Sequence, residues 1–470
     1  MSEALPFLIV AGLLDAYASG RALLRHHGVP TTLFWLMVIW VLPLGGALLY
    51  LGTAAPYLPR RKAQRRRARI LEAGLQPSGL PLEPPHDPLG LFEICLRLTQ
   101  RPATRGNQLR FLGEGPEAFG AIEAALAAAQ RSIWVEYYII KNDETGGRFL
   151  DLLITRAQAG VEVRLLYDAV GSLGLDAHRL KRLRNAGGRA EAFLPVNPLR
   201  RRWSVHLRNH RKIVVVDGRD AFTGGMNVGD EYSGRARRRG EQHFHDAFLA
   251  LNGPVVQDLA SVFAEDWAYA TDELLPLPEL CAATSMGADI AVLASGPDQQ
   301  RNAHALAWFT AISTARKRLW LTSPYFIPDA ATHMALVCAA LRGVDVRIQV
   351  PAPQHMDVRL VGWASRGHFA PLLQGGVRIF EYQASMLHAK TLVVDDLLAM
   401  VGSANVDIRS MHLNFEASAI TTDATFMHTL GSRFLVDLGH CTEVTLDALE
   451  SQGLWRRLGL GVARLMSPLL

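Results

Sequence analysis

The pattern of apolar and polar positions divides the chain into two unlike parts. Near the N-terminus two stretches are almost wholly apolar: residues 5–20, which contain Asp15, and residues 31–52, which carry no charge. A helix of about 20 apolar residues is long enough to cross the roughly 30 Å hydrocarbon core of a bilayer. We therefore expect residues 31–52 to form a transmembrane helix. Whether residues 5–20 also span a membrane or lie at its surface stays open.

Beyond residue 100 the pattern changes to short apolar runs that follow glycines, and it occurs twice. "AGVEVRLLYD" (159–168) resembles "RGVDVRIQVP" (342–351), and "NAGGRAEAF" (185–193) resembles "LQGGVRIFEY" (373–382). In each case a glycine ends a helix and an apolar strand follows. The repeat is too long for a solenoid, so the two copies indicate a duplicated domain. The alternation of helix and strand predicts an α/β fold, with a mixed sheet flanked by helices.

A further pair of segments carries chemistry as well as pattern. "LRNHRKIVVVDG" (207–218) and "SMLHAKTLVVDD" (385–396) both contain the spacing His-x-Lys-x4-Asp. Residues two apart in a strand point to the same side, so each copy brings a histidine and a lysine to one face. These four residues are His210, Lys212, His388 and Lys390.

Each of these strands leads into a turn of small residues that ends in an asparagine. The turns are "TGGMN" and "VGSAN". Small residues let the backbone and the asparagine amide approach a bound group closely. The residues expected to contact a phosphate are Gly225, Asn227, Ser403 and Asn405. Two histidines, two lysines and two asparagines around a pseudo-twofold axis form a compact cationic site that suits a phosphodiester.

Phosphoryl chemistry explains each residue type. A neutral imidazole is a competent nucleophile toward phosphorus near pH 7, and a protonated imidazole can give its proton to the leaving oxygen. Lysines and asparagine amides stabilise charge on the non-bridging oxygens, which a metal ion does in other enzymes. We therefore expect neither a metal nor another cofactor.

Charge and cysteine content narrow the class of protein. The 470 residues carry a net charge of +5, which favours an anionic partner such as nucleic acid or an anionic membrane surface. Four cysteines without a CxxC pair argue against a zinc site and against a disulfide framework. Seven lysines or arginines lie between residues 60 and 69. By the positive-inside rule they stay in the cytoplasm, and so does the chain that follows.

The repeated HxKxxxxD motif, followed by GG or GS and then an asparagine, resembles the phospholipase D superfamily over roughly residues 105–450. Further segments are similar to bacterial cardiolipin synthases: "EYYI" (136–139), "FTGGMNVGDEY" (222–232), "SPYFIPD" (323–329) and "VGSANVDIRSMHLNFE" (401–416). The resemblance implies two tandem phospholipase D-like α/β/α domains related by a pseudo-twofold axis. The expected parts are a membrane anchor (1–58), a basic and proline-rich linker (59–100), domain 1 (101–280), domain 2 (281–450) and an amphipathic tail (451–470).

What the resemblance implies chemically is a phosphatidyl transfer. One histidine attacks the phosphate of a phosphatidylglycerol, glycerol leaves, and a hydroxyl of a second phosphatidylglycerol resolves the phosphatidyl-histidine to give cardiolipin. By analogy His210 is the nucleophile and His388 the acid, then the base. The superfamily motif also counts Asp217 and Asp395 as catalytic. Along each strand the aspartate points to the face opposite to that of the histidine, which favours a role in the following turn.

A histidine in either role needs its second ring nitrogen held, usually by a carboxylate. The family's pattern supplies Asp246, 36 residues after His210, and Glu416, 28 residues after His388. We expect each carboxylate to hold the histidine of its own copy. The family has an aromatic residue and an arginine before this aspartate, where this chain has "FH".

Two aromatic residues and the C-terminal tail have two interpretations each. Tyr137 and Tyr325 end apolar runs, where they pack in the core or line the site. Residues 454–465 place leucines and a valine near one helical face and arginines elsewhere. This pattern fits an interfacial membrane helix and equally a helix that packs on the catalytic body.

Other functions remain as alternatives. A phospholipase D, or a phosphatidyltransferase that uses another alcohol, would share the motifs; a phosphodiesterase or nuclease would act on a different substrate. The expected anchor, and the lack of an evident stripe of basic and aromatic residues, argue against nucleic acid as a partner. Two intact motifs argue against a non-catalytic scaffold. We expect phospholipid substrates and a place in the bacterial inner membrane, with the catalytic domains in the cytoplasm. The sequence leaves open the oligomeric state, and whether the second lipid is phosphatidylglycerol or phosphatidylethanolamine.

Overall fold

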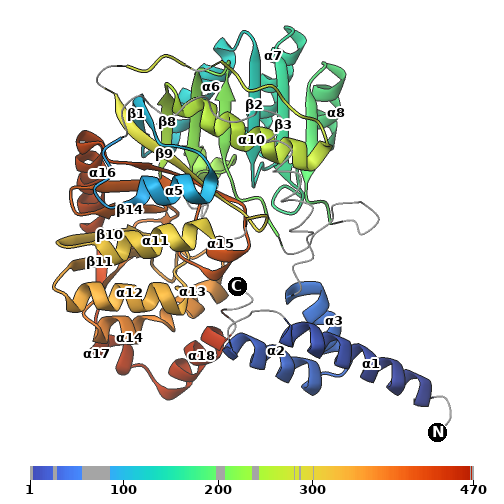
Figure 1. Ribbon diagram of the computed structural model, residues 1–470, viewed down its shortest axis with the longest axis vertical. Helices are drawn as coiled ribbons and strands as arrows, with labels where there is room; N and C mark the ends of the chain where they lie inside the picture. Colours follow the sequence, from blue (N-terminus) through green and yellow to red (C-terminus); the bar gives the residue numbers. More distant parts are fainter. Residues whose placement is uncertain are drawn as a thin grey trace.

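The computed structural model describes residues 4–24, 29–54, 85–196, 207–235, 243–279, 281–284, 287–299, 301–465 and 467 (Figure 1). The basic cluster at 60–69 and most of the expected linker lie outside these residues. The strands of the first half are β1 (Thr104–Leu112), β2 (Ser132–Tyr137), β3 (Glu162–Asp168), β4 (Arg189–Phe193), β5 (Ile213–Val216), β6 (Asp220–Gly224), β7 (Phe244–His245) and β8 (Phe248–Asn252). Those of the second half are β9 (Ala288–Ser295), β10 (Arg318–Thr322), β11 (Asp345–Pro351), β12 (Arg378–Tyr382), β13 (Met386–Leu387), β14 (Thr391–Val394), β15 (Leu398–Gly402), β16 (Glu416–Thr421) and β17 (Cys441–Val444).

A single mixed sheet of 15 strands runs through both halves, which meet where β1 pairs antiparallel with β9. Outward from this junction the order is β8, β6, β5, β2, β3, β4 in the first half. In the second half it is β16, β15, β14, β10, β11, β12, followed by the additional edge strand β17. Corresponding strands thus occupy corresponding places on the two sides of the junction. This arrangement confirms the predicted α/β fold and its duplication.

Helices cover both faces of the sheet. The first half contributes α6 (Gly115–Ala128), α7 (Glu144–Gln158), α8 (Ala177–Asn185), α9 (Asp230–Ser233) and α10 (Val255–Thr271). The second half contributes α11 (Ala303–Thr314), α12 (Ala330–Leu341), α13 (Arg359–Arg366), α14 (Phe369–Gln374), α15 (Ile408–His412), α16 (Ala424–Leu438), α17 (Leu446–Glu450) and α18 (Leu454–Leu465).

One hydrophobic core is shared between the halves. It combines side chains of α10 and α16 with strand residues of both copies, whereas the outer helices of each half form separate cores of their own. The same aromatic pair recurs: Trp134 of β2 stacks on Phe263 of α10, and Trp320 of β10 stacks on Phe434 of α16. Because the shared core removes apolar surface of both copies from water, the two domains stabilise each other.

Part of the expected linker is folded. Residues Leu91–Thr99 form α5, whose buried side chains Leu91, Phe92 and Cys95 belong to the outer core of the second half. The linker assignment is therefore wrong for this segment, because its apolar residues recur at helical spacing and find a surface to cover. The boundary expected at 280/281 stays a prediction; it falls between α10 and β9.

The N-terminal apolar region forms several helices, and the stretch at 31–52 is not one continuous helix. These are α1 (Ala4–Leu23), α2 (Val29–Val41), α3 (Gly45–Leu49) and a π-helical turn (Tyr50–Ala54). Among the described residues no helix is both long enough and apolar enough to cross a bilayer. One continuous helix over residues 31–52, as predicted, does not form, because this stretch is divided between α2 and α3.

The reason lies in the turn between α2 and α3. Pro43 has no N–H to continue the helix, and Leu44 takes a positive φ of 65°. The 13 residues of α2 span about 20 Å, less than a hydrocarbon core. In α1, the Asp15 carboxylate accepts a hydrogen bond of 3.0 Å from the backbone N–H of Leu44, which ties the first helix to this turn.

Candidate active site

The segment before each His-Lys strand pairs with the opposite half of the molecule. The N–H of His210 donates to the carbonyl of Phe415 at 2.9 Å, beside the bridge between Asn209 and Phe415. In the other copy β13 pairs in parallel with β7, and the N–H of His388 donates to the carbonyl of His245 at 2.6 Å. Each histidine is therefore placed next to the chain segment that carries the carboxylate of the other copy.

Because each histidine segment pairs with the opposite half, each histidine is held by the carboxylate of the other copy. His210 Nδ1 lies 3.0 Å from Glu416 Oε2, and His388 Nδ1 lies 2.6 Å from Asp246 Oδ2. All four side chains are buried. The expectation that each carboxylate holds the histidine of its own copy is wrong. The number of residues between a motif and a carboxylate does not show whether that carboxylate will contact the histidine of its own half or of the other half.

The two lysines lie deep in the same site. Lys212 Nζ donates to the carbonyl of His210 at 2.6 Å, and Lys390 Nζ donates to the carbonyl of His388. Burial lowers the pKa of Lys390 to about 8, and it lowers the pKa of Lys212 well below its usual value. The charge of Lys390 acts on His210 as well as on His388, so both motifs converge on one centre.

Burial also sets the charge state of the imidazoles. It lowers the pKa of His388 to about 4, together with the repulsion from Lys390 and against the attraction of Asp246. It lowers the pKa of His210 against the attraction of Glu416. Burial by itself raises the pKa of Glu416, but the interactions with His210 and Lys212 outweigh it and leave that pKa at about 2. An ionised carboxylate only accepts, so each neutral imidazole carries its proton on Nδ1 and has its lone pair on Nε2. At His388 this nitrogen lies 3.2 Å from Lys390 Nζ.

Asp217 and Asp395 lie at the far ends of β5 and β14, away from this centre. Their carboxylates accept hydrogen bonds from backbone N–H groups at the starts of β2 and β10. The donors are Gln130, Arg131 and Ser132 for Asp217, and Arg316, Lys317 and Arg318 for Asp395. Both aspartates take a positive φ, 54° and 52°. This geometry corrects the catalytic assignment, because carboxylates occupied in this way fix the start of the neighbouring strand.

The small-residue turns support the orienting carboxylates. Ser403 Oγ donates to Glu416 Oε2 at 2.5 Å. A Cβ at Gly225 would stand 2.1 Å from Asp246 Oδ1, so only glycine leaves room for that carboxylate. We therefore reassign Gly225 and Ser403 from phosphate contact to support of Asp246 and Glu416.

The two asparagines differ from each other. Asn227 accepts from the N–H of Ile139 at 3.3 Å and donates to the Tyr232 hydroxyl at 2.8 Å. Asn405 Oδ1 is buried and has no hydrogen-bond partner within the described part of the chain. Phosphate contact by either asparagine stays a prediction.

Aromatic rings that the sequence did not single out border both histidines. Tyr138 packs edge-on against His210 at 4.9 Å between ring centroids, and Tyr232 packs in the same way against His388 at 5.3 Å. Tyr137, for which both core packing and a place at the site were open, is buried against Phe149. Successive residues of an extended chain point to opposite faces. The alternation within "EYYI" could therefore have separated the tyrosine that faces the core from the one that faces the site.

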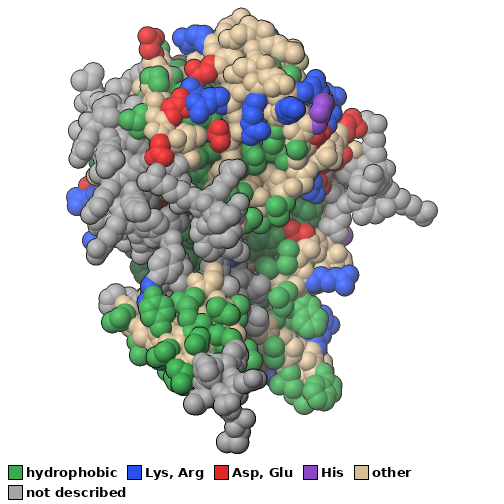
Figure 2. All heavy atoms as spheres, turned by 90° about the vertical axis from the view of Figure 1, so that its right-hand side faces the viewer, with side chains coloured by type: hydrophobic (Ala, Val, Ile, Leu, Met, Phe, Trp, Pro, Cys, Tyr) green, Lys and Arg blue, Asp and Glu red, His purple; other side chains and the backbone are tan. Residues whose placement is uncertain are grey.

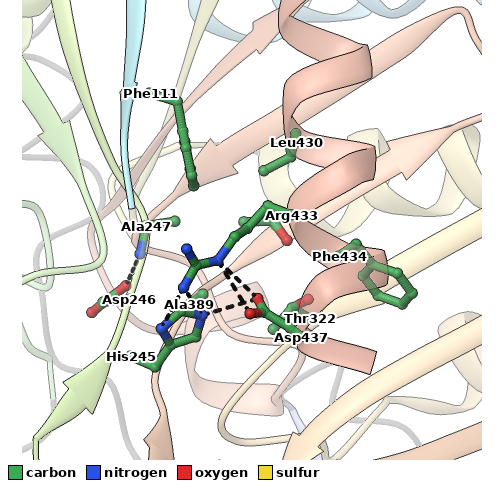
Figure 3. A pocket seen from close by; sticks show the side chains of 11 residues that line it. Phe111, His245, Asp246, Ala247, Thr322, Ala389, Leu430, Arg433, Phe434 and Asp437 are labelled. Carbon is green, nitrogen blue, oxygen red and sulfur yellow. Dashed lines mark hydrogen bonds and ion pairs between the residues drawn. The ribbon is translucent and has the colours of Figure 1, made fainter. Parts of the chain in front are cut away.

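A pocket lined by His245, Asp246 and residues of α16 shows how β7 is anchored (Figure 3). His245 Nε2 lies 2.9 Å from Asp437 Oδ2, and the guanidinium of Arg433 lies against both side chains. Both partners belong to α16 of the second half. Where the family resemblance leads us to expect an arginine before Asp246, this chain has His245, and the guanidinium of Arg433 lies against it. The anchored carbonyl of His245 in turn holds the N–H of His388.

Comparison with known proteins decides the family. The family described as "Cardiolipin synthase, PLD-like domain" matches residues 122–267 and 309–438. The chain belongs to the cardiolipin synthase family. Its members are phosphatidyltransferases with phospholipase D-like domains, and this chain is such an enzyme.

Two relatives and one solved structure illustrate the similarity. The cardiolipin synthase of Geobacillus kaustophilus (strain HTA426) is 38% identical over 461 residues, which cover 95% of this chain and 90% of that protein. Cardiolipin synthase A of Pseudomonas putida (strain W619) is 41% identical over 378 residues, which cover 80% of this chain and 77% of that protein. The phosphatidylserine synthase of Haemophilus influenzae Rd KW20 shares the fold, with a TM-score of 0.59, 14% identity, and coverage of 81% of this chain and 97% of that chain.

The exchanged pairing in this synthase predicts which histidine responds to which carboxylate. Asp246→Asn removes the negative charge at His388 Nδ1, so we expect the imidazole resonances of His388 to change while those of His210 stay nearly constant. Glu416→Gln has the opposite effect. Both variants fold, and each loses turnover by about 10²-fold or more because the orientation and charge of one imidazole are lost. Histidine-labelled NMR spectra and initial rates provide the measurements. Perturbation of His210 by Asp246→Asn would contradict the pairing.

The position of Asp395 predicts a structural effect. Asp395→Ala leaves three backbone N–H groups without their acceptor, so we expect the free energy of unfolding to fall by about 1–3 kcal/mol. Turnover per folded molecule stays within about threefold, because the carboxylate does not reach the histidines. The neighbouring Asp396 is exposed, and Asp396→Ala is the matched control, with an effect within about 0.5 kcal/mol. Denaturant unfolding and initial rates measure both effects; full stability with lost activity would restore the catalytic assignment.

Lys390 predicts the alkaline limit of activity. A lysine that stabilises a phosphate must be protonated, so kcat/KM falls as the pH rises through about 8, where Lys390 loses its proton. Lys390→Arg keeps the cation at every accessible pH, so we expect the loss of activity near pH 8 to become smaller. The loss due to Lys212, whose pKa burial also lowers, remains. Lys317→Arg changes an exposed lysine and serves as control. An unmoved limb in Lys390→Arg would assign the limit to another group.

Proposed function

We propose that this enzyme joins two phosphatidylglycerol molecules to give cardiolipin and glycerol, through a covalent phosphatidyl-histidine. The observation that carries the proposal is the pair of buried imidazoles, each neutral, each held at Nδ1 by a carboxylate, with two lysines beside them. Relatives that share more than a third of its residues are named cardiolipin synthases.

In the first step His210 Nε2 attacks the phosphorus of one phosphatidylglycerol. The bond from phosphorus to the glycerol oxygen breaks, and protonated His388 gives its proton to that oxygen. The substrate phosphate itself favours this protonation, because its negative charge raises the pKa of a nearby imidazole. Lys212 and Lys390 stabilise the non-bridging oxygens, with Asn227 and Asn405 as further candidates.

In the second step a headgroup hydroxyl of another phosphatidylglycerol gives its proton to His388 and attacks the same phosphorus. The bond from phosphorus to His210 breaks, cardiolipin forms, and the imidazole returns to its starting state. The two copies are too alike to distinguish the nucleophile from the acid. We therefore take the roles of His210 and His388 from the family's pattern.

The place of action follows from the substrate. Phospholipids reside in the bilayer, so we place the reaction at the bacterial inner membrane. The cytoplasmic orientation depends on the basic cluster at 60–69, which lies outside the described residues. We include no nucleic acid among the partners, and the oligomeric state is left open.

The test incubates the purified full-length chain with phosphatidylglycerol vesicles, without added metal and with a chelator present. We expect cardiolipin and glycerol in equal amounts, detected by mass spectrometry. Phosphatidic acid without cardiolipin would indicate a phospholipase D, and cleavage of nucleic acid without lipid turnover would contradict a lipid substrate.

Histidine variants test the proposed order in the same assay. His210→Asn and His388→Asn each lose turnover by about 10²-fold or more, whereas the exposed His178→Asn stays close to the parent enzyme. After rapid denaturation in detergent at neutral to mildly alkaline pH, which preserves a phosphorus–nitrogen bond, labelled lipid remains covalently attached in His388→Asn and is absent from His210→Asn. The reverse result would exchange the two roles.

A further inference from the structure

The C-terminal helix α18 packs on α13 at the margin of the second half. Its buried residue Ala463 contacts a small cluster that includes Ala364 of α13 and Ile327. The approach of the two helices is close, since a Cβ at Gly459 would stand 2.9 Å from the ring of Trp363. This contact settles the interpretation of the tail in part: one side of α18 packs on the catalytic body.

The remaining sides of this helix pair present large apolar residues to the outside. The exposed residues, named here the α13–α18 face, are Val358, Leu360, Trp363, Leu454, Trp455, Leu458, Val462 and Leu465. Trp455 is 85% exposed, the highest exposure among the large apolar residues of the described chain. Contiguous apolar surface of this kind marks an interaction site, because a monomer in water rarely maintains it.

The charge of the helix pair indicates what the face contacts. The two helices contain arginines and no acidic residue: Arg359, Arg366, Arg456, Arg457 and Arg464. Arg366 is paired with Glu381, and the other four leave an excess of positive charge around the apolar residues. Leucine and tryptophan bordered by arginine is the composition of helices that lie in the interface of an anionic bilayer.

The face adjoins the active site on the His388 side. Asp357 directly precedes α13, and its carboxylate accepts a hydrogen bond of 2.7 Å from the hydroxyl of Tyr325. The charge of Asp357 acts on His388 and on Lys390, so this segment lies within electrostatic reach of the centre. Figure 1 places α18 at the same end of the molecule as α1 and α2, and Figure 2 shows hydrophobic side chains gathered at that end.

We propose that the α13–α18 face docks on an anionic phospholipid bilayer and brings the His388 side of the active site to the lipid headgroups. A substrate then reaches the histidines by its headgroup while its acyl chains stay in the membrane. The inference deepens the proposed function, and it rests on that function only for the identity of the substrate.

The test compares full-length variants in vesicle flotation. Trp455→Ser with Leu458→Ser removes two anchors, so we expect binding to phosphatidylglycerol vesicles to fall by about tenfold. Turnover on these vesicles falls in proportion, and the loss is smaller for short-chain phosphatidylglycerol dissolved as monomers. Leu435→Ser with Val436→Ser removes two exposed apolar residues of α16 and is the matched control, expected to match the parent chain. Unchanged binding and turnover of the Trp455/Leu458 variant would overturn the proposal.

A fluorescent label separates docking from catalysis. The label is placed on Leu458→Cys after the exposed Cys338 is changed to serine, with Val436→Cys as the control site. We expect a blue shift at position 458, and none at 436, when phosphatidylglycerol vesicles are added. A shift that follows protein concentration without vesicles would overturn the proposal in favour of self-association. A vesicle-dependent shift without any cardiolipin formation would leave docking in place and remove the proposed reaction.

Discussion

The exchange of hydrogen-bonding partners between the two halves is the constraint on which the site depends. His210 is fixed by Phe415 and Glu416 of the second half, and His388 by His245 and Asp246 of the first. Neither copy alone therefore contains an oriented histidine. The shared core that includes α10 and α16 fixes the position of the two copies relative to each other, and the contacts to the histidines depend on that position.

Burial is the second determinant of the chemistry. Two lysines, two histidines and two carboxylates lie in one poorly solvated centre, and burial lowers the pKa of both lysines and of both imidazoles. Burial thus disfavours positive charge in this centre. A phosphodiester anion reverses this preference on entry, since it favours protonation of the groups around it. The site is in this way matched to a substrate that brings its own negative charge.

The apolar segments of the chain take two different forms. In the catalytic domains they alternate with polar residues and form strands and helix faces that meet in the cores. At the N-terminus and in α18 they leave large side chains exposed on helices, among them Leu13, Trp40 and Trp455. Hydropathy alone did not show that the apolar stretch at 31–52 is interrupted. The interruption lies at Pro43 and Leu44, where the backbone N–H of Leu44 bonds to Asp15.

The sequence by itself determined the α/β class, the duplication and the residue types of the site. These follow from periodicities and motifs that extend over only a few residues, such as the shared face of His210 and Lys212. Only the tertiary structure decided that Glu416 serves His210, that Tyr138 rather than Tyr137 borders the site, and that Asp395 holds the start of a neighbouring strand rather than the turn that follows it. Such contacts join residues far apart in the chain. They depend on how whole strands cross between the halves, and no local spacing records that crossing.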